Sequence, residues 1–327
     1  MRRALWLVLL GLPLAAQPKL LINAKPDVQS AASGLEPAFR ALLPAQPQPA
    51  WIGYTVPAVR TYGLGCEYVH DNGPGAGVMH LEPPDHAIIL FRVVGNAVER
   101  IRAVSPNCEI DAGDVPFHWL NDVQPAQSVA LLSTFVTDRQ VAYNSALSAI
   151  AMHSDPAADA ALDRFLAASQ PDNIRMRVVS VMGSTRGKRG VEILKNLIAN
   201  DPDERVRERA VNALGSSKES EATALLIDIA RNNASARLRA QAVSDLGHKT
   251  SPDVPAVLSA AIANDADTNV KRRAVSALST LPDGQGIPAL IDLVKNGKTP
   301  EIRKQAMQSL EHTRDPRATA FFEQMLK

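Results

Sequence analysis

Small and apolar residues recur along the second half of the chain at a fixed spacing of 32 residues. The segment RVRERAVNALG, residues 205–215, returns in related form one period earlier and one, two and three periods later. One column of this pattern holds alanine or valine at each step: Ala146, Val178, Ala210, Ala242, Ala274 and Ala306. A constant period of this length predicts an array of stacked structural repeats.

Each repeat is expected to contain two helices. The first helix carries two apolar columns three residues apart, so both columns lie on one helix face. These columns are Leu162, Leu194, Leu226, Leu258, Leu290 and Phe322, then Phe165, Leu197, Ile229, Ala261, Leu293 and Met325. The restated segment is the second helix, and we expect Gly183, Gly215 and Gly247 to end it in a left-handed cap. The array is predicted over residues 121–327, with about six units and a final half-unit.

Residues 17–120 have a different pattern, in which short β-prone runs alternate with turns. It predicts a helix over residues 35–43 and strands over 19–23, 51–56, 66–69, 86–94 and 97–105. Gly95 and Asn96 suit a tight hairpin turn between the last two strands. The aromatic residues are expected to form the core of this small α+β domain, with a binding surface as the alternative: Trp51, Tyr54, Tyr62, Tyr68, Phe91, Phe117 and Trp119.

The first 16 residues are typical of a secretory signal peptide. Arg2 and Arg3 precede an apolar run, and the small residues Ala15 and Ala16 suit cleavage. The run is too short for a membrane span, and no later segment reaches that length. We therefore expect an exported chain, periplasmic or secreted, in which Cys66 and Cys108 form a disulfide. Two buried free thiols are the alternative for these cysteines.

The interhelical turns carry a second regular feature. An acidic or amide residue stands six positions before a basic one in Asp201 with Arg207, Asn233 with Arg239 and Asp265 with Lys271. With the small-residue column and the paired helices, this pattern resembles HEAT-like repeats, in particular the short repeats of phycobilin lyases. The resemblance implies an all-α solenoid, a right-handed superhelix of two-helix units, that follows the α+β domain. It also implies an Asp–Arg ladder between units, formed by Asp201, Asp265, Arg175, Arg207, Arg239, Lys271 and Arg303.

The ladder is expected to break where Ser169 and Gly297 occupy acidic positions. Short HEAT-like arrays include a di-iron hydroxylase whose ligands are repeated His-Glu pairs, and this chain has no His-Glu dipeptide. The sequence also lacks a glycine-rich phosphate loop, a G-x-S-x-G elbow and an H-E-x-x-H motif. We therefore expect no cofactor and no enzymatic activity.

Residues 108–118 offer the strongest alternative site. Glu109, Asp111, Asp114 and His118 lie close together there and could hold a divalent cation. This interpretation makes the chain a metal-binding or hydrolytic protein whose array recruits the substrate. The competing interpretation is a polar turn in which Asp111 bonds its own loop backbone, and the sequence favours it.

The second helices carry most of the candidate binding residues. They hold 12 basic residues against four acidic ones, whereas the whole chain has a formal charge of +1 and gives no reason to expect nucleic acid. In HEAT-like arrays the second helices line the concave side, so the resemblance implies a basic groove. We expect Arg177, Arg205, Arg209, Arg237 and Arg273 to meet an acidic protein partner, which makes the protein an exported interaction scaffold. A solvated, mildly basic face is the alternative.

Overall fold

The computed structural model describes residues 21–44, 49–59, 84–138 and 145–326. The chain divides into two compact units, Met1–Leu162 and Asp163–Lys327. The predicted signal peptide, the strand at 66–69, and Tyr62 and Tyr68 lie outside the described residues. The division at Leu162 differs from the sequence-based boundary at residue 120, because helices after the sheet pack against it.

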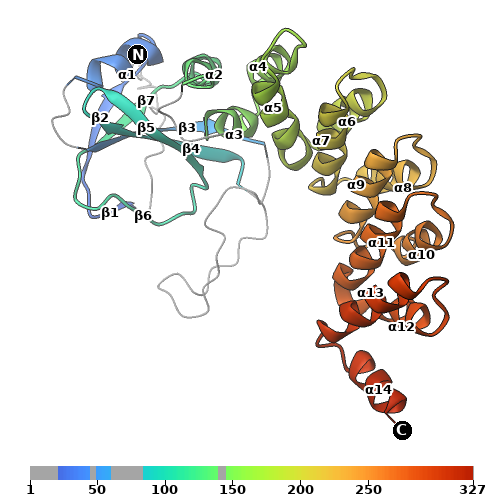
Figure 1. Cartoon of the computed structure of the whole chain (residues 1–327). Coiled ribbons are helices and arrows are strands. Elements are labelled where there is room, and N and C mark those ends of the chain that lie inside the picture. The colour runs from blue at the N-terminus through green and yellow to red at the C-terminus, as the bar shows by residue number, and fades with distance from the viewer. Residues whose placement is uncertain (1–20, 45–48, 60–83, 139–144, 327) are drawn as a thin grey trace, which may run out of the picture. The chain divides into compact units, whose positions relative to one another are not determined.

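The first unit is built on a mixed β-sheet (Figure 1). Among the described residues, five strands have the order β2-β7-β3-β4-β5, and β1 and β6 form a separate parallel pair. The β2–β7 and β7–β3 pairs are parallel, whereas β3, β4 and β5 form an antiparallel meander. The strands are β1 (Leu21–Ile22), β2 (Pro26–Ser30), β3 (Ala50–Pro57), β4 (His86–Val94), β5 (Ala97–Val104), β6 (Ile110–Asp111) and β7 (Phe117–Asn121).

The predicted hairpin is confirmed as β4–β5. Val94 pairs with Ala97, so Gly95 and Asn96 form the two-residue connection. Gly95 has a φ of 60°, a left-handed conformation that glycine adopts without a steric penalty. The strands β2 and β7 were not predicted, because Pro26 and the polar residues of β2 carry no strand pattern.

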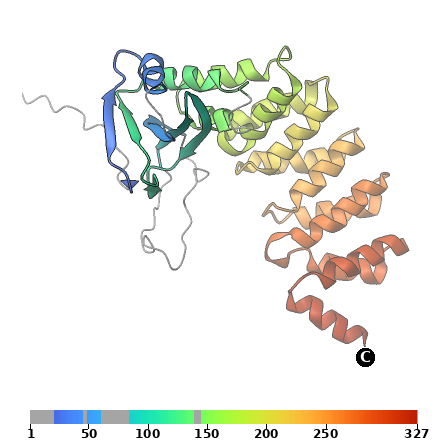
Figure 2. The same cartoon turned by 60° about the vertical axis from the view of Figure 1, so that its left-hand side comes forward.

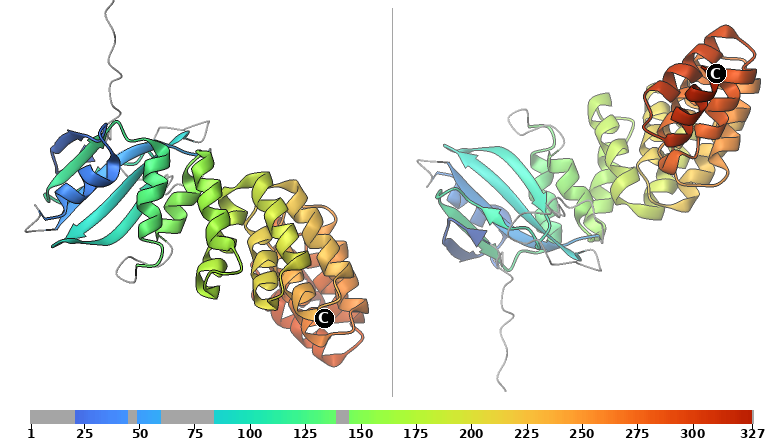
Figure 3. Two further views of the ribbon diagram at one scale, coloured as in Figure 1. Left: turned by 90° about the horizontal axis from the view of Figure 1, so that it is seen from above. Right: turned by 90° about the horizontal axis from the view of Figure 1, so that it is seen from below.

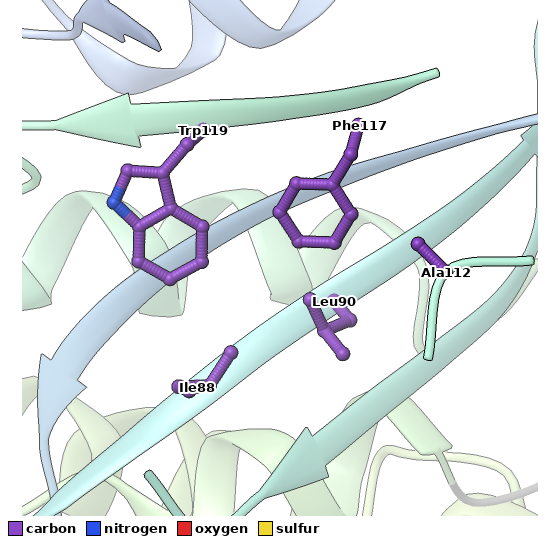
Figure 4. Packing of buried hydrophobic residues seen from close by; sticks show 5 residues of the cluster. All are labelled: Ile88, Leu90, Ala112, Phe117 and Trp119. Atoms are coloured by element: carbon purple, nitrogen blue, oxygen red, sulfur yellow. The ribbon is translucent and has the colours of Figure 1, made fainter. Parts of the chain in front are cut away.

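Both faces of the sheet are covered. On one face Phe39 of helix α1 (Leu35–Leu42) lies 4.8 Å from Phe91 of β4, measured between ring centroids. Figure 3 shows α1 and α2 (Pro125–Thr134) in front of the sheet when the first unit is seen from above. On the other face Trp119 and Phe117 of β7 pack toward Ile88 and Leu90 of β4 (Figure 4). Tyr54, Phe91, Phe117 and Trp119 therefore form core, as predicted, and the half-buried Trp51 packs against this core.

The second unit is a stack of helix pairs (Figure 2). First helices and second helices follow one another along opposite sides of the stack (Figure 1). The division between the two units falls within α4 (Pro156–Leu166). The later first helices are α6 (Gly187–Asn200), α8 (Ser220–Asn232), α10 (Val254–Asn264), α12 (Ile287–Asn296) and α14 (Pro316–Met325). The second helices of this unit are α5 (Asp172–Thr185), α7 (Glu204–Gly215), α9 (Ala236–Leu246), α11 (Thr268–Thr280) and α13 (Pro300–Glu311).

Most positions of the predicted packing columns are buried, whereas Ala261, Leu293 and Phe322 are half-buried. The small-residue column from Ala146 to Ala306 is at most 1% exposed, and Leu194, Leu226, Leu258 and Leu290 are fully buried. The half-unit α14 buries Phe321 but leaves Met325 53% exposed, so Met325 does not continue its column into the core. Helix α3 (Ser145–Met152) continues the repeat register but packs on β5 of the first unit.

The predicted role of the column glycines is wrong. Gly183, Gly215 and Gly247 are absent from the described positive-φ glycines, and the φ of Gly247 is −58°. Instead, these residues give space to the next second helix: a Cβ at Gly183 would lie 1.9 Å from the carbonyl oxygen of Ala213. The repeated glycine is therefore explained by close packing between successive second helices and not by a left-handed turn at the end of one helix.

Candidate protein-binding face of the second helices

The five arginines that the sequence predicts to bind a partner differ in burial and in their contacts. Arg177, on α5, is only 9% exposed, which is a correction because a buried guanidinium cannot form part of a solvated surface. The other four lie on α7, α9 and α11 and are at least partly exposed: Arg205, Arg209, Arg237 and Arg273. They differ in the chemistry of the groups they contact.

Arg205 and Arg237 are paired with carboxylates. The Arg205 side chain donates to Asp172 at 2.7 Å and to Asp203 at 2.8 Å. Arg237 donates to Glu208 of the preceding second helix at 2.6 Å. The hydrogen bonds from Arg205 also hold the pKa of Asp203 below its usual value. Because their charge is balanced locally, Arg205 and Arg237 contribute little net positive charge to this face.

Arg209 and Arg273 contact neutral hydroxyl groups. Arg209 donates to Ser180 Oγ at 2.7 Å, and Arg273 donates to Ser244 Oγ at 3.3 Å. Gln305 donates to Ser276 Oγ at 3.1 Å in the same register, 29 residues apart. Each bond joins one second helix to the preceding one, and we call these three pairs the polar row. The serine hydroxyls cannot neutralise the charges of Arg209 and Arg273. Arg273 also interacts electrostatically with the buried Asp245 carboxyl.

The ladder implied by the resemblance is present in alternate units. Arg239 donates to both carboxylate oxygens of Asp265, at 2.8 and 2.9 Å, and Arg175 bonds the buried Asp201. These hydrogen bonds are the main cause of the lowered pKa of Asp265. The ladder breaks at Gly297, as predicted, because glycine offers only its carbonyl oxygen, which accepts from Arg303 at 2.7 Å.

The arginines of the same column also make hydrogen bonds inside their own units. Arg207 donates to the carbonyl oxygen of Asp201 at 2.6 Å, and Arg239 donates to that of Asn233 at 2.9 Å. The arginine thus fixes its own interhelical turn and, in alternate units, the next turn as well. Ladder residues serve the scaffold and leave the exposed row to supply binding groups.

Sequence reasoning missed a buried polar cluster in the array. The Asp245 carboxylate is 8% exposed as a residue and accepts from Gln241 at 2.9 Å and Asn212 at 3.3 Å. Burial raises the pKa of Asp245 to about 6, despite these hydrogen bonds. The nearby Lys249 is also buried, which lowers its pKa, and it donates to the carbonyl oxygen of Ser217 at 2.6 Å. The sequence contains a signal for this cluster, because Asp245 is charged and the equivalent positions of the other repeats are not: Val181, Ala213, Ala277 and Ser309.

The alternative site at residues 108–118 is a structured turn. Asp111 accepts from the backbone of Gly113 at 2.8 Å and from Asn23 at 3.0 Å, and these bonds lower its pKa. His118 pairs with Asp27 of β2 at 2.9 Å. Within the described residues, no group of three His, Cys, Asp or Glu side chains is placed to hold a metal ion, so Glu109, Asp111, Asp114 and His118 do not converge. Cys66 lies outside the described residues, so its bond to Cys108 stays a prediction.

A buried relay in the first unit was also missed. Ser128 of α2 lies 2.8 Å from both the Tyr54 hydroxyl and His153 Nε2. His153 Nδ1 contacts the carbonyl oxygen of Ala149 at 2.8 Å, so Nδ1 donates and Nε2 accepts from Ser128. All three side chains are fully buried, and burial raises the pKa of Tyr54. The relay joins β3 to α2 and the end of α3, which is a structural role.

Comparison with known proteins identifies the repeats. A family model for HEAT repeats matches residues 158–247 and 255–327. A comparison with curated proteins finds no match. Across the described part of the chain, none of the helices has the length and apolar character needed to cross a membrane.

Solved structures with partial similarity include the following three. The E. coli protein YIBA is 24% identical over 52% of this chain and 64% of its own, with a TM-score of 0.36, so this chain spans less than two thirds of it. Human deoxyhypusine hydroxylase is 18% identical over 57% of this chain and 73% of its own, with a TM-score of 0.32. The CpcE–CpcF complex of phycocyanin lyase from Nostoc is 18% identical over 60% of this chain and 80% of that chain, with a TM-score of 0.33.

These similarities contradict one expectation. The prediction that the protein is not an enzyme is wrong. It was inferred from the scaffold and from missing motifs, but two of these three similar structures are enzymes by name. A repeat scaffold can carry catalytic groups on its helices without any short linear motif. Neither the array nor the missing motifs therefore excludes catalysis.

Proposed function

The chain is a HEAT-like repeat protein, and from this premise we propose that it is exported and binds a protein partner through the second-helix face of its array. The partner surface is acidic where it meets Arg209 and Arg273. Export is supported by the two arginines, the apolar run and the small residues of the first 16 positions.

One observation carries the binding proposal: Arg209 and Arg273 stand in the polar row with serine hydroxyls as their partners, at 2.7 and 3.3 Å. Positive charges held in fixed positions attract an acidic surface and orient it during encounter. Arg205 and Arg237 are less suitable, since nearby carboxylates already balance them. The candidate binding residues are therefore Arg209 and Arg273, two of the five arginines predicted from the sequence.

The test is capture of partners from a cell-envelope extract of the source organism, with the full chain as bait. We expect a protein that the wild type retains and the double variant Arg209→Glu/Arg273→Glu loses, with retention that weakens as salt is raised. The matched control is Lys195→Glu/Arg231→Glu, which makes the same charge change at exposed positions on the first helices α6 and α8. Equal retention by the wild type and both variants would refute the proposed face.

A further inference from the structure

A polar pocket lies between the second helices α11 and α13. It has a volume of about 650 Å³, and the helices and the turn after α13 line it. The side chains that matter most are Ser276, Ser279, Gln305, Gln308, His312 and Arg314. It adjoins the polar row, because the Gln305–Ser276 bond forms part of both.

The pocket opens where the column of glycines ends. Gly183 and Gly247 let the next second helix approach, since a Cβ at Gly247 would lie 3.0 Å from the Cα of Ala277. The next position in this column is Ser279, whose hydroxyl donates to the carbonyl oxygen of Ser276 at 2.7 Å. A side chain at this position excludes the close backbone contact that the glycines allow. Short polar side chains line the space that results.

The lining chemistry selects the ligand. Hydroxyl and amide groups provide both donors and acceptors, as a peptide main chain requires, and Arg314 adds a guanidinium suited to a carboxylate. The lining residues include no carboxylate and no tryptophan, tyrosine or phenylalanine. Of the acidic groups close in sequence, Asp315 is paired with Arg317 at 2.6 Å, and Glu311 lies beside His312 on α13. A single arginine is too few for the phosphate backbone of a nucleic acid, which needs many cationic contacts.

We infer that this pocket binds an acidic peptide segment of the partner, with an Asp or Glu carboxylate on Arg314 and the main chain on the amide and hydroxyl groups. This inference rests on the proposed function for the identity of the ligand as protein. The amide of Gln305 is already fixed, because its nitrogen donates to the carbonyl oxygen of Arg272 at 2.8 Å and also to Ser276. This leaves the amide oxygen to accept from a peptide N–H. A fixed amide loses little conformational entropy on binding.

The experiment measures fluorescence anisotropy of labelled nonapeptide pools titrated with the full chain. One pool has a central Glu, a second has Gln and a third has Lys, with all other positions randomised. We expect the Glu pool to bind about tenfold more tightly than the Gln pool, which is the size of one charge-assisted pair. The preference should disappear in Arg314→Gln, which removes the charge, and all pools should weaken in Ser276→Tyr, which fills the pocket.

The control is Arg272→Gln, an equal loss of charge on α11 at a residue that does not line the pocket. It should retain the preference for Glu. Equal binding of the three wild-type pools, an unchanged preference in Arg314→Gln, or unchanged affinities in Ser276→Tyr would each overturn the inference. The outcome can be distinguished from that of the proposed function. A captured partner that depends on Arg209 and Arg273 but not on Arg314 would support the proposed function and refute peptide binding in the pocket. Binding of the peptide pools without such a partner would support the pocket and refute the proposed function.

Discussion

At the scale of single residues, Asp245 is the position where the array departs most from its own pattern. Its column otherwise holds Val181, Ala213, Ala277 and Ser309. Burial raises its pKa to about 6 from the usual 3.8, so the carboxyl is less acidic in the folded protein than in the unfolded chain. A raised pKa means that the stabilising contribution of the protonated form is complete below pH 3.8 and is lost as pH rises through about 6.

We predict that Asp245→Asn removes this pH dependence. A shift from 3.8 to about 6 corresponds to about 3 kcal/mol of unfolding free energy, an order-of-magnitude value, lost by the wild type between pH 4 and pH 7. The variant has no carboxyl at this position and keeps an amide that can bond Asn212 and Gln241. The denaturant midpoint of the variant relative to the wild type should therefore rise across this pH interval.

Asp228→Asn is the control, because Asp228 is exposed on α8 and its substitution makes the same charge change. Its midpoint should follow the wild-type pH profile. Parallel pH profiles for Asp245→Asn and the wild type would show that the Asp245 carboxyl is not perturbed by burial.

At the scale of elements, the glycine column sets the separation of the second helices. Alanine is normally preferred to glycine within a helix by about 1 kcal/mol. At Gly183 the new Cβ would lie 1.9 Å from the carbonyl oxygen of Ala213, so α5 and α7 would have to separate. The sign of the change in unfolding free energy on Gly183→Ala therefore shows whether helix propensity or helix packing dominates.

We predict that Gly183→Ala destabilises the array by about 1–3 kcal/mol, the usual cost of overpacking. Ser279→Ala is the matched control, since the same column already carries a Cβ there, and its effect should be small. The measurement is the denaturant midpoint followed by helical circular dichroism. A Gly183→Ala protein as stable as the wild type would mean that the helices adjust their separation at no cost.

Elements defined by local periodicity could be predicted from sequence, and those defined by distant pairing could not. The columns through Leu226 and Ala242 located the helices of the array, and a β-prone run before the Gly95–Asn96 turn located β4 as residues 86–94. The strand β2 pairs with β7, so that Val28 lies opposite Trp119, and nothing local to Val28 shows this pairing. The candidate site follows the same rule: helical spacing placed the arginines on second helices, but ion pairing to Asp172 and Glu208 depends on neighbouring units.

At the scale of the whole molecule, the two compact units have different sources of stability. The array is held by contacts between successive helices, so its stability is distributed along neighbouring units. The unit Met1–Leu162 depends on pairing between distant segments, such as β2 with β7, and contains both cysteines of the chain. A disulfide would therefore act on the first unit and leave the array unaffected.

The last prediction is that Cys66 and Cys108 are joined by a disulfide bond. Cys108 is 4% exposed in the first unit. Closing a loop of about 43 residues would stabilise this unit by roughly 4 kcal/mol through the entropy of the unfolded chain. Thiol titration of the denatured, unreduced protein should find no reactive thiol, and a reductant should lower the melting transition of the first unit alone. The double variant Cys66→Ser/Cys108→Ser serves as control, because a reductant should not change its melting. Two reactive thiols per chain, or a reductant effect that persists in the double variant, would refute the bond, since only a covalent link between these sulfurs couples redox state to the stability of one unit.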